Sequence, residues 1–276
     1  MYQALYRKYR SQTFGQLVGQ QVVARTLRQA VEQDKISHAY LFSGPRGTGK
    51  TSVAKIFAKA MNCPNQKGGE PCNECYICEA ITNGSLEDVI EIDAASNNGV
   101  DEIRDIRDKS TYAPSLAKHK VYIIDEVHML STGAFNALLK TLEEPTENVV
   151  FILATTELHK IPATILSRVQ RFEFKSIKLP DIVQHLENIL ATEGIAYEAD
   201  AVQIIARRAE GGMRDALSIL DQALSLTAGS ELTTAIAEEI TGSISLAALD
   251  QYVAAILNHD ATAALDQLAI IFDNGK

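Results

Sequence analysis

The sequence predicts an α/β domain, with a parallel sheet and helices on both faces, followed by a smaller helical domain. Short apolar runs alternate with helical patterns up to about residue 175, an order typical of βα units. After Pro180 the strand-like runs stop, and apolar residues recur at helical spacing. A glycine-rich segment, "GPRGTGKT" (44–51), lies between a predicted strand and a predicted helix, the position that phosphate-binding loops occupy.

The strands of the α/β part are predicted from apolar runs that are long enough to be buried. These runs are residues 39–44, 88–93, 120–126, 148–156 and 169–175. Helical patterns lie between them near residues 50–61, 100–110 and 131–143. We expect each helix to connect two parallel strands.

The region after Pro180 is predicted to be helical throughout. Its four amphipathic segments end near glycines and cover residues 181–194, 198–212, 213–224 and 232–242. We therefore divide the chain into a nucleotide-binding domain at residues 1–178, a helical lid domain at 179–243, and the start of a further, truncated helical domain at 244–276.

Length, composition and charge limit the class of protein. A chain of 276 residues exceeds the usual size of one domain. A net charge of −9 argues against a protein that coats nucleic acid by itself, although it does not exclude a local basic surface. The chain shows no signal peptide and no apolar stretch of membrane-spanning length. We expect a cytoplasmic protein without a membrane partner.

The segment "GPRGTGKT" fits the phosphate-loop pattern G-x-x-x-x-G-K-[ST]. Its glycines would let backbone N–H groups surround the phosphates of ATP at a helix N-terminus. Lys50 would neutralise phosphate oxygens, and the Thr51 hydroxyl would bind Mg²⁺. An ordinary glycine-rich turn is the alternative. The predicted nucleotide-binding residues are Gly44, Pro45, Arg46, Gly47, Thr48, Gly49, Lys50, Thr51 and Ser52.

Two acidic residues follow the apolar run of "VYIIDEVH" (121–128). A buried strand would deliver Asp125 and Glu126 to its carboxyl end, where ligands collect in open α/β sheets. Asp125 would hold the Mg²⁺ together with Thr51, and Glu126 would polarise the attacking water. Two acids that merely end a strand are the alternative. We expect His128 to pack or cap rather than to take part in catalysis.

All four cysteines of the chain lie within 16 residues, with the spacing C-x8-C-x2-C-x2-C. Four thiolates in a reducing compartment favour a tetrahedral Zn²⁺ site. An iron–sulfur cluster or free thiols are the alternatives. A site closed by Cys63, Cys72, Cys75 and Cys78 leaves no position for a substrate, so we expect the metal to be structural.

Several longer segments resemble one known family. "VYIIDEVHMLSTGAFNALLKTLEEP" (121–145), "FILATTELHKIPATILSR" (151–168) and "EGGMRDALSILDQA" (210–223) are similar to the gamma/tau subunits of bacterial DNA polymerase III, the AAA+ ATPases of the clamp loader. The likeness extends along essentially the whole chain. In this family the cysteine module is an insertion after the phosphate-loop helix, which corresponds here to residues 63–78.

The resemblance implies further site residues. Thr155 matches a strand-end residue that senses the γ-phosphate; we choose it over Thr156 because alternation along a strand lets only one of the two face the nucleotide. Arg168 matches a finger that reaches the neighbouring subunit's site, although Val169 replaces the cysteine of the family's Ser-Arg-Cys motif. Arg214 matches a lid arginine above the phosphates. The segment 5–20 is similar to a strap near the adenine, with Tyr6, Tyr9, Arg10 and Val18 as candidates.

The resemblance also implies the function. It implies an ATP-driven motor, stimulated by clamp and DNA, in a hetero-oligomeric ring that loads the sliding clamp onto primer–template DNA. Its partners would be the other clamp-loader subunits, the clamp and DNA. Asn97, Asn98 and Gly99 could lie near DNA, but a purely structural turn is the alternative. Three rival functions are a non-hydrolysing structural subunit, a helicase or branch-migration motor, and a zinc-based interaction module.

Overall fold

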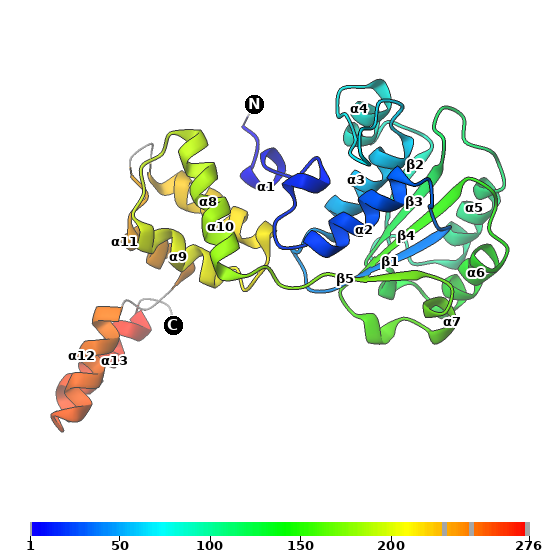
Figure 1. Cartoon of the computed structure of the whole chain (residues 1–276). Coiled ribbons are helices and arrows are strands. Elements are labelled where there is room, and N and C mark those ends of the chain that lie inside the picture. Colours follow the sequence, from blue (N-terminus) through cyan, green and yellow to red (C-terminus); the bar gives the residue numbers. More distant parts are fainter. Residues whose placement is uncertain (1, 228–230, 243–245, 274–276) are drawn as a thin grey trace. The chain divides into compact units, whose positions relative to one another are not determined.

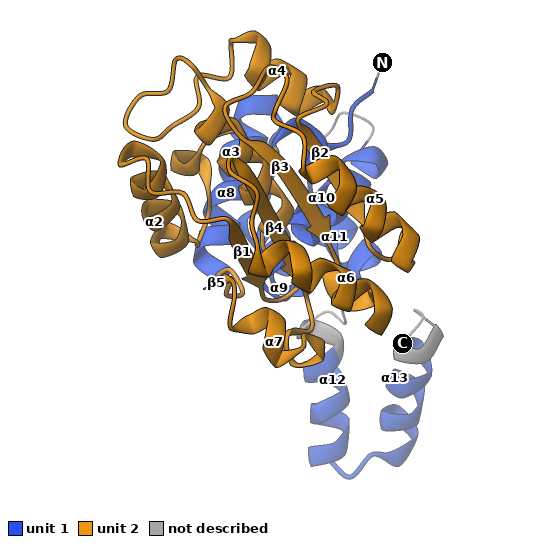
Figure 2. Ribbon diagram, turned by 90° about the vertical axis from the view of Figure 1, so that its right-hand side faces the viewer, with its two compact units in different colours: residues 1–9, 178–276 blue, residues 10–177 orange. Residues whose placement is uncertain are grey.

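The computed structural model describes residues 2–227, 231–242 and 246–273 (Figure 1). Contacts between Cα atoms divide the chain into two compact units (Figure 2). One unit is Arg10–Ile177, and the other combines Met1–Tyr9 with Lys178–Lys276. Residues 1–9 were predicted to belong to the nucleotide-binding domain, whereas the contacts group them with the helical unit. The expected boundary at residue 243 lies outside the described residues.

The α/β unit is built on a five-stranded parallel sheet, which confirms the predicted fold class. The strand order is β2-β3-β4-β1-β5. The strands are β1 (Ala39–Ser43), β2 (Val89–Asp93), β3 (Lys120–Asp125), β4 (Val149–Thr155) and β5 (Gln170–Glu173). Because Ser43 pairs with Thr155 and Asp93 with Asp125, the carboxyl ends of neighbouring strands meet at one edge of the sheet.

Two apolar cores cover the two faces of this sheet. Alternate side chains of β1, such as Tyr40 and Phe42, join one core with α2 and α3, while Ala39 and Leu41 join the other with α5 and α6. The helices are α2 (Gln21–Glu32), α3 (Lys50–Asn62), α4 (Tyr76–Asn83), α5 (Val100–Ser110), α6 (Thr132–Glu143) and α7 (Ala163–Leu166). Single 3-10 turns form η1 (Phe14–Gln16), η2 (Val127–Met129) and η3 (Leu158–Lys160).

The second unit is helical. Its helices are α1 (Leu5–Lys8), α8 (Leu179–Glu193), α9 (Ala199–Arg208), α10 (Met213–Thr227), α11 (Thr234–Thr241), α12 (Leu246–Leu257) and α13 (Ala261–Asp273). Side chains beside α1 tie the N-terminus to this unit, since Tyr2 donates to Asp221 and both Lys8 and Tyr9 donate to Glu193. Within the described residues, no helix is long and apolar enough to cross a membrane.

Candidate functional site

The segment between β1 and α3 forms an open cradle. Gly44, Gly47 and Gly49 all have positive φ, a backbone conformation that L side chains rarely adopt. A Cβ on Gly44 would lie 2.1 Å from the carbonyl oxygen of Phe174, whereas a Cβ on Gly49 would meet nothing within 4 Å. Gly44 therefore permits close packing against the end of β5, and Gly49 borders free space at the N-terminus of α3. This is the geometry in which backbone N–H groups bind phosphate.

The residues that open α3 bring a cation and a hydroxyl to this cradle. Lys50 is buried, and its Nζ donates to the carbonyl oxygens of Gly44 and Pro45, each at 2.8 Å. Burial lowers the pKa of Lys50, and the charges of Glu126 and Asp125 act against that shift. Thr48 packs inside the loop and donates to Pro45 at 2.8 Å, while Pro45 and Arg46 are exposed.

A direct contact joins the loop to the end of β3. The Thr51 hydroxyl donates to Oδ2 of Asp125 at 2.6 Å, and the other carboxylate oxygen accepts the N–H of Glu126 at 2.9 Å. A hydroxyl and a carboxylate in contact are the two oxygen ligands expected for Mg²⁺ beside a phosphate loop. The residues present therefore fit a magnesium–nucleotide complex.

Glu126 belongs to a polar cluster at the end of β4. Its Oε2 accepts the hydroxyl of Thr156 at 3.0 Å and the N–H of Thr156 at 3.3 Å. His128 lies between the acids, with Nδ1 3.4 Å from Glu126 and Nε2 3.3 Å from Glu157. The same Nδ1 lies 3.0 Å from the hydroxyl of Thr155, which is fully buried.

Two members of this cluster were not predicted from the sequence. His128 was expected only to pack or cap, and neither Glu157 nor the contact from Thr156 to Glu126 was anticipated. In the sequence, a histidine two residues after an acid only weakly indicates a role in the site. The contact between His128 and Thr155 depends on how β3 and β4 align, which the local sequence does not show. The choice of Thr155 as the γ-phosphate sensor stays a prediction.

The other candidate residues lie apart from the Lys50 cradle or border it. Arg168 donates to Glu143 in α6 and to the carbonyl oxygen of Thr164 in α7, both at 2.6 Å, and to the hydroxyl of Ser167 at 3.1 Å. Arg10 Nε donates to Ser52 in the first turn of α3 at 2.9 Å. Val18 is half-buried.

In the helical unit, the Arg214 guanidinium lies 5.3 Å from the ring centre of Tyr6, and Tyr9 bonds Glu193. Both tyrosines therefore have their described side-chain contacts within that unit, together with the predicted lid arginine.

The candidate DNA loop between β2 and α5 is held by its own hydrogen bonds. The backbone carbonyl of Asp93 accepts the Asn97 side chain at 3.1 Å, and the Asp93 carboxylate accepts the hydroxyl of Ser96 at 2.9 Å. The carbonyl of Asn98 accepts the N–H of Ser131 at 3.1 Å. These contacts fit a structural connection; a contact of this loop with DNA stays a prediction.

The four cysteines converge on one point. Their sulfur atoms all lie within 4.8 Å of one another, and those of Cys63 and Cys75 are 3.9 Å apart. Zinc–sulfur bonds of about 2.3 Å in a tetrahedron place sulfur atoms about 3.8 Å apart, so the cluster fits such an ion. Burial raises the pKa of Cys63 and Cys78. A cation is what would let these buried thiols ionise.

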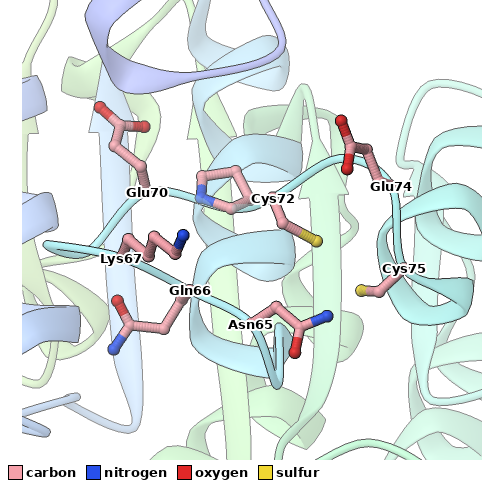
Figure 3. A pocket seen from close by; sticks show the side chains of 8 residues that line it. Asn65, Gln66, Lys67, Glu70, Cys72, Glu74 and Cys75 are labelled. Carbon is pink, nitrogen blue, oxygen red and sulfur yellow. The ribbon is translucent and has the colours of Figure 1, made fainter.

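The pKa of Cys72 moves in the opposite direction. The backbone N–H of Glu74 is the main cause and lowers the pKa of Cys72 to about 7. Cys72 and Cys75 lie beside a pocket, with their sulfur atoms visible in Figure 3. The volume of this pocket is about 790 Å³. The pocket is lined by Asn65, Gln66, Lys67, Glu70, Pro71, Cys72, Glu74 and Cys75.

Comparison with known families finds two matches that together cover most of the chain. Residues 19–178 match the family described as "DNA polymerase III, delta subunit". Residues 181–229 match "DNA polymerase III clamp loader subunit, ATPase lid domain".

Curated relatives match with high identity. DNA polymerase III subunit tau of Bacillus subtilis is 58% identical over 275 residues, which are 100% of this chain and 49% of the relative. Subunit tau of Escherichia coli is 51% identical over 85% of this chain and 36% of its own length. Subunit gamma of Buchnera aphidicola from Schizaphis graminum is 47% identical over 82% of this chain and 62% of its own length. The chain thus spans about a third to two thirds of these relatives.

Solved structures share the fold. The RuvB Holliday junction branch migration motor of Thermotoga maritima aligns with a TM-score of 0.61 and 17% identity, covering 90% of this chain and 79% of that one. A single-site variant of the same motor gives a TM-score of 0.62, also at 17% identity, over 90% of this chain and 79% of that one. Likeness at this identity identifies an AAA+ type fold and says nothing of the reaction.

Proposed function

The chain belongs to the DNA polymerase III clamp-loader ATPase family, on its gamma/tau branch, and on this premise we propose that it is the ATP-hydrolysing motor portion of a sliding-clamp loader. The observation that carries the proposal is the 2.6 Å contact between Thr51 and Asp125, at the mouth of a glycine cradle that holds Lys50. An open cradle, a cation and a paired hydroxyl and carboxylate together form the machinery of nucleotide hydrolysis.

The residues of the site divide the work. The N–H groups around Gly47 and Gly49 bind phosphate, and Lys50 leaves its loop carbonyls to neutralise the γ-phosphate. Thr51 and Asp125 would hold Mg²⁺, which when bound supplies charge neutralisation to the phosphates. Glu126 orients and polarises the water that attacks the γ-phosphate. Thr155, at the end of β4, senses that phosphate.

Assembly completes the site in this proposal. Arg168 reaches the neighbouring subunit's nucleotide, and Arg214 couples nucleotide state to the angle of the helical lid. The partners are other clamp-loader subunits, the clamp and primer–template DNA, and such a role in replication belongs to the cytoplasm. The cysteine cluster would hold zinc as a structural ion, because its four ligands leave no open position.

The decisive variant is Glu126→Gln in the full-length protein, assembled with its partner subunits. We expect it to bind ATP within about threefold of wild type and to lose about 10²–10⁴ in clamp- and DNA-stimulated turnover, the usual contribution of a general base. Lys50→Ala should lose both binding and turnover. Glu32→Gln, at the exposed end of α2, is the matched control. Full turnover in either site variant would refute the assignment.

A branch-migration motor is the rival that the shared fold suggests. Identity of 58% to a DNA polymerase III subunit, against 17% to RuvB, favours the clamp loader. The same assay separates the two functions, because a clamp loader requires primed DNA and clamp for full stimulation. A four-way DNA junction that stimulated turnover without clamp would favour the rival.

A further inference from the structure

Four polar side chains form a junction between the cysteine insertion (63–78) and the segment that precedes α2. The junction consists of Gln12, Lys59, Asn73 and Glu70. Lys59 is 1% exposed, and its Nζ donates to the side-chain oxygens of Asn73 at 2.6 Å and Gln12 at 2.7 Å. Asn73 in turn donates to the carbonyl oxygen of Gln12 at 3.2 Å. Burying a lysine ammonium group this completely is unfavourable unless its N–H groups are hydrogen-bonded. Lys59 therefore depends on the oxygens of Asn73 and Gln12.

Glu70 makes the second half of the junction. Its two carboxylate oxygens accept the N–H groups of Phe14 at 2.8 Å and Gly15 at 3.0 Å, where η1 begins. Gly69 has a φ of +77°, and a Cβ there would lie 2.2 Å from the carbonyl oxygen of Arg28 in α2. Figure 3 shows Glu70 pointing away from the cysteine sulfurs. The insertion therefore uses one edge for the metal ligands and another for this contact.

The segment held by the junction also touches the phosphate loop. We call residues 10–20 the entry segment. At one end Arg10 donates to Ser52 at 2.9 Å; at the other end Gln20 donates to the carbonyl oxygen of Lys175 at 2.7 Å and reaches that of Thr48 at 3.5 Å. Between them Phe14 is buried in the core. Any displacement of this segment would move groups that touch the nucleotide cradle.

Glu70 and Asn73 lie in a part of the insertion that the structure describes as neither helix nor strand. Asn73 is adjacent to Cys72, and Glu70 lies two residues before that cysteine. This stretch has an isolated bridge between Lys67 and Glu70 and hydrogen bonds from the N–H groups of Gly69 to Gln66 and of Cys72 to Cys63. Metal bonds to the cysteines would supply a further constraint, as they do in small metal-folded modules.

We infer that the cysteine insertion is a positioning element for nucleotide binding: metal bound by the four cysteines fixes Glu70 and Asn73, which hold the entry segment against the phosphate loop. This inference rests on the proposed nucleotide-binding function and gives the insertion a task within it. Coupling between the binding free energies of two sites is reciprocal, so bound nucleotide must also raise the affinity of the cysteines for the metal.

The test uses Glu70→Ala and Asn73→Gly in the full-length protein, loaded with zinc. Asn73 has a φ of +60°, which glycine adopts without strain, so the second variant removes side-chain contacts and leaves the backbone satisfied. Glu79→Ala, exposed in α4 directly after the last cysteine ligand, is the matched control. Equilibrium binding of fluorescent ADP, zinc content and amide exchange of residues 10–20 are measured for each.

We expect both junction variants to keep one zinc per chain, to bind ADP about tenfold more weakly, and to exchange amides faster in the entry segment. Coupling energies of this kind usually correspond to about 5–150-fold. In equilibrium competition with a chelator, wild-type protein should bind zinc about tenfold more tightly when ADP is bound, and the junction variants should lose that gain. Glu79→Ala should match wild type in every measurement.

Two different results would overturn the inference. Zinc-loaded junction variants that bind ADP as wild type does would show that the insertion has no part in nucleotide binding. Equal zinc affinities with and without ADP would contradict the reciprocal coupling. Wild-type protein that failed to bind ADP at all would instead defeat the proposed function on which the inference rests.

Discussion

Asp88 is a single residue that organises a whole loop. It is 3% exposed, and its carboxylate accepts the N–H groups of Ser115, Leu116 and Ala117 at 2.8–3.0 Å. Burial raises the pKa of Asp88, but these N–H donors outweigh it and leave the pKa below its ordinary value of 3.8. The ionised carboxylate is therefore stabilised in the folded state.

We predict that Asp88→Asn lowers the free energy of unfolding by about 1–3 kcal/mol at pH 7, because the three backbone N–H groups lose a charged acceptor. A carboxyl whose pKa is lowered by folding stabilises the protein at any pH above its unfolded-state pKa. This stabilisation is lost as the pH falls through the folded-state pKa. Urea unfolding should show a constant gap between wild type and variant from pH 7 to about pH 5, narrowing below about pH 4. A gap that widened in acid would contradict this account.

Thr155 and Thr156 are neighbours with different partners. The hydroxyl of Thr155 lies against His128, whereas that of Thr156 bonds Glu126. We predict that Thr155→Val weakens ATP about tenfold and leaves ADP unchanged, because a γ-phosphate contact exists only with ATP. Binding is measured on the isolated full-length subunit. Equal losses of ATP and ADP affinity would show that Thr155 does not sense the γ-phosphate. An ATP-specific loss in Thr156→Val would assign the sensor role to Thr156.

Single residues also mark the limit of sequence-based prediction. The phosphate loop and the acidic pair follow from a local pattern, and the structure brings Thr51 to Asp125 as that pattern requires. The partners of His128 depend instead on which residue of β4 lies beside it, which no local pattern encodes. Contacts of polar side chains between strands distant in sequence were therefore not predictable.

At the scale of elements, the buried strands were the most predictable. β1, β3 and β4 are continuous apolar runs because both of their faces are covered. Helix α2 was missed although Val23, Leu27 and Val31 repeat at four-residue spacing. Helix α4 carries a weaker signal, because it is short and its N-cap is Cys75, whose side chain accepts from Cys78.

The phosphate loop is an element in which two glycines have different tasks. We predict that Gly44→Ala lowers the free energy of unfolding by about 2 kcal/mol or more, since its Cβ would overlap the Phe174 carbonyl. Gly49→Ala meets no protein atom within 4 Å and should cost less stability. It should nonetheless abolish ADP binding, because its Cβ would extend into the open space where we propose that the phosphates bind. Urea unfolding without nucleotide and fluorescent ADP binding separate the two effects.

The contrast has a clear failure condition. If Gly49→Ala destabilised the protein as much as Gly44→Ala, backbone strain alone would account for both glycines, since both have positive φ. If Gly49→Ala bound ADP normally, the open space at the start of α3 would not be the phosphate site.

At the scale of the whole molecule, we propose that Arg168 acts in a neighbouring subunit. In the single chain its guanidinium pairs with Glu143 at 2.6 Å, with both side chains partly exposed. Exposed ion pairs contribute about 0–1 kcal/mol, so assembly can redirect Arg168 at little cost. We therefore predict that the isolated chain is monomeric with weak ATPase activity, which light scattering and turnover assays check; a stable ring formed by this chain alone would refute it.

Mixed assemblies test whether Arg168 acts on a neighbour. Lys50→Ala disables the site of its own subunit, so adding Arg168→Ala to the same subunit removes nothing further if the arginine acts there. If Arg168 acts in trans, the double variant also silences the adjacent wild-type site, where a finger contributes about 10³–10⁵ in rate. We predict a larger loss of clamp- and DNA-stimulated turnover for the double variant than for Lys50→Ala alone. The control double variant combines Lys50→Ala with Arg25→Ala, a substitution of an exposed arginine on α2. Equal losses of turnover for the two double variants would show that Arg168 acts in its own subunit.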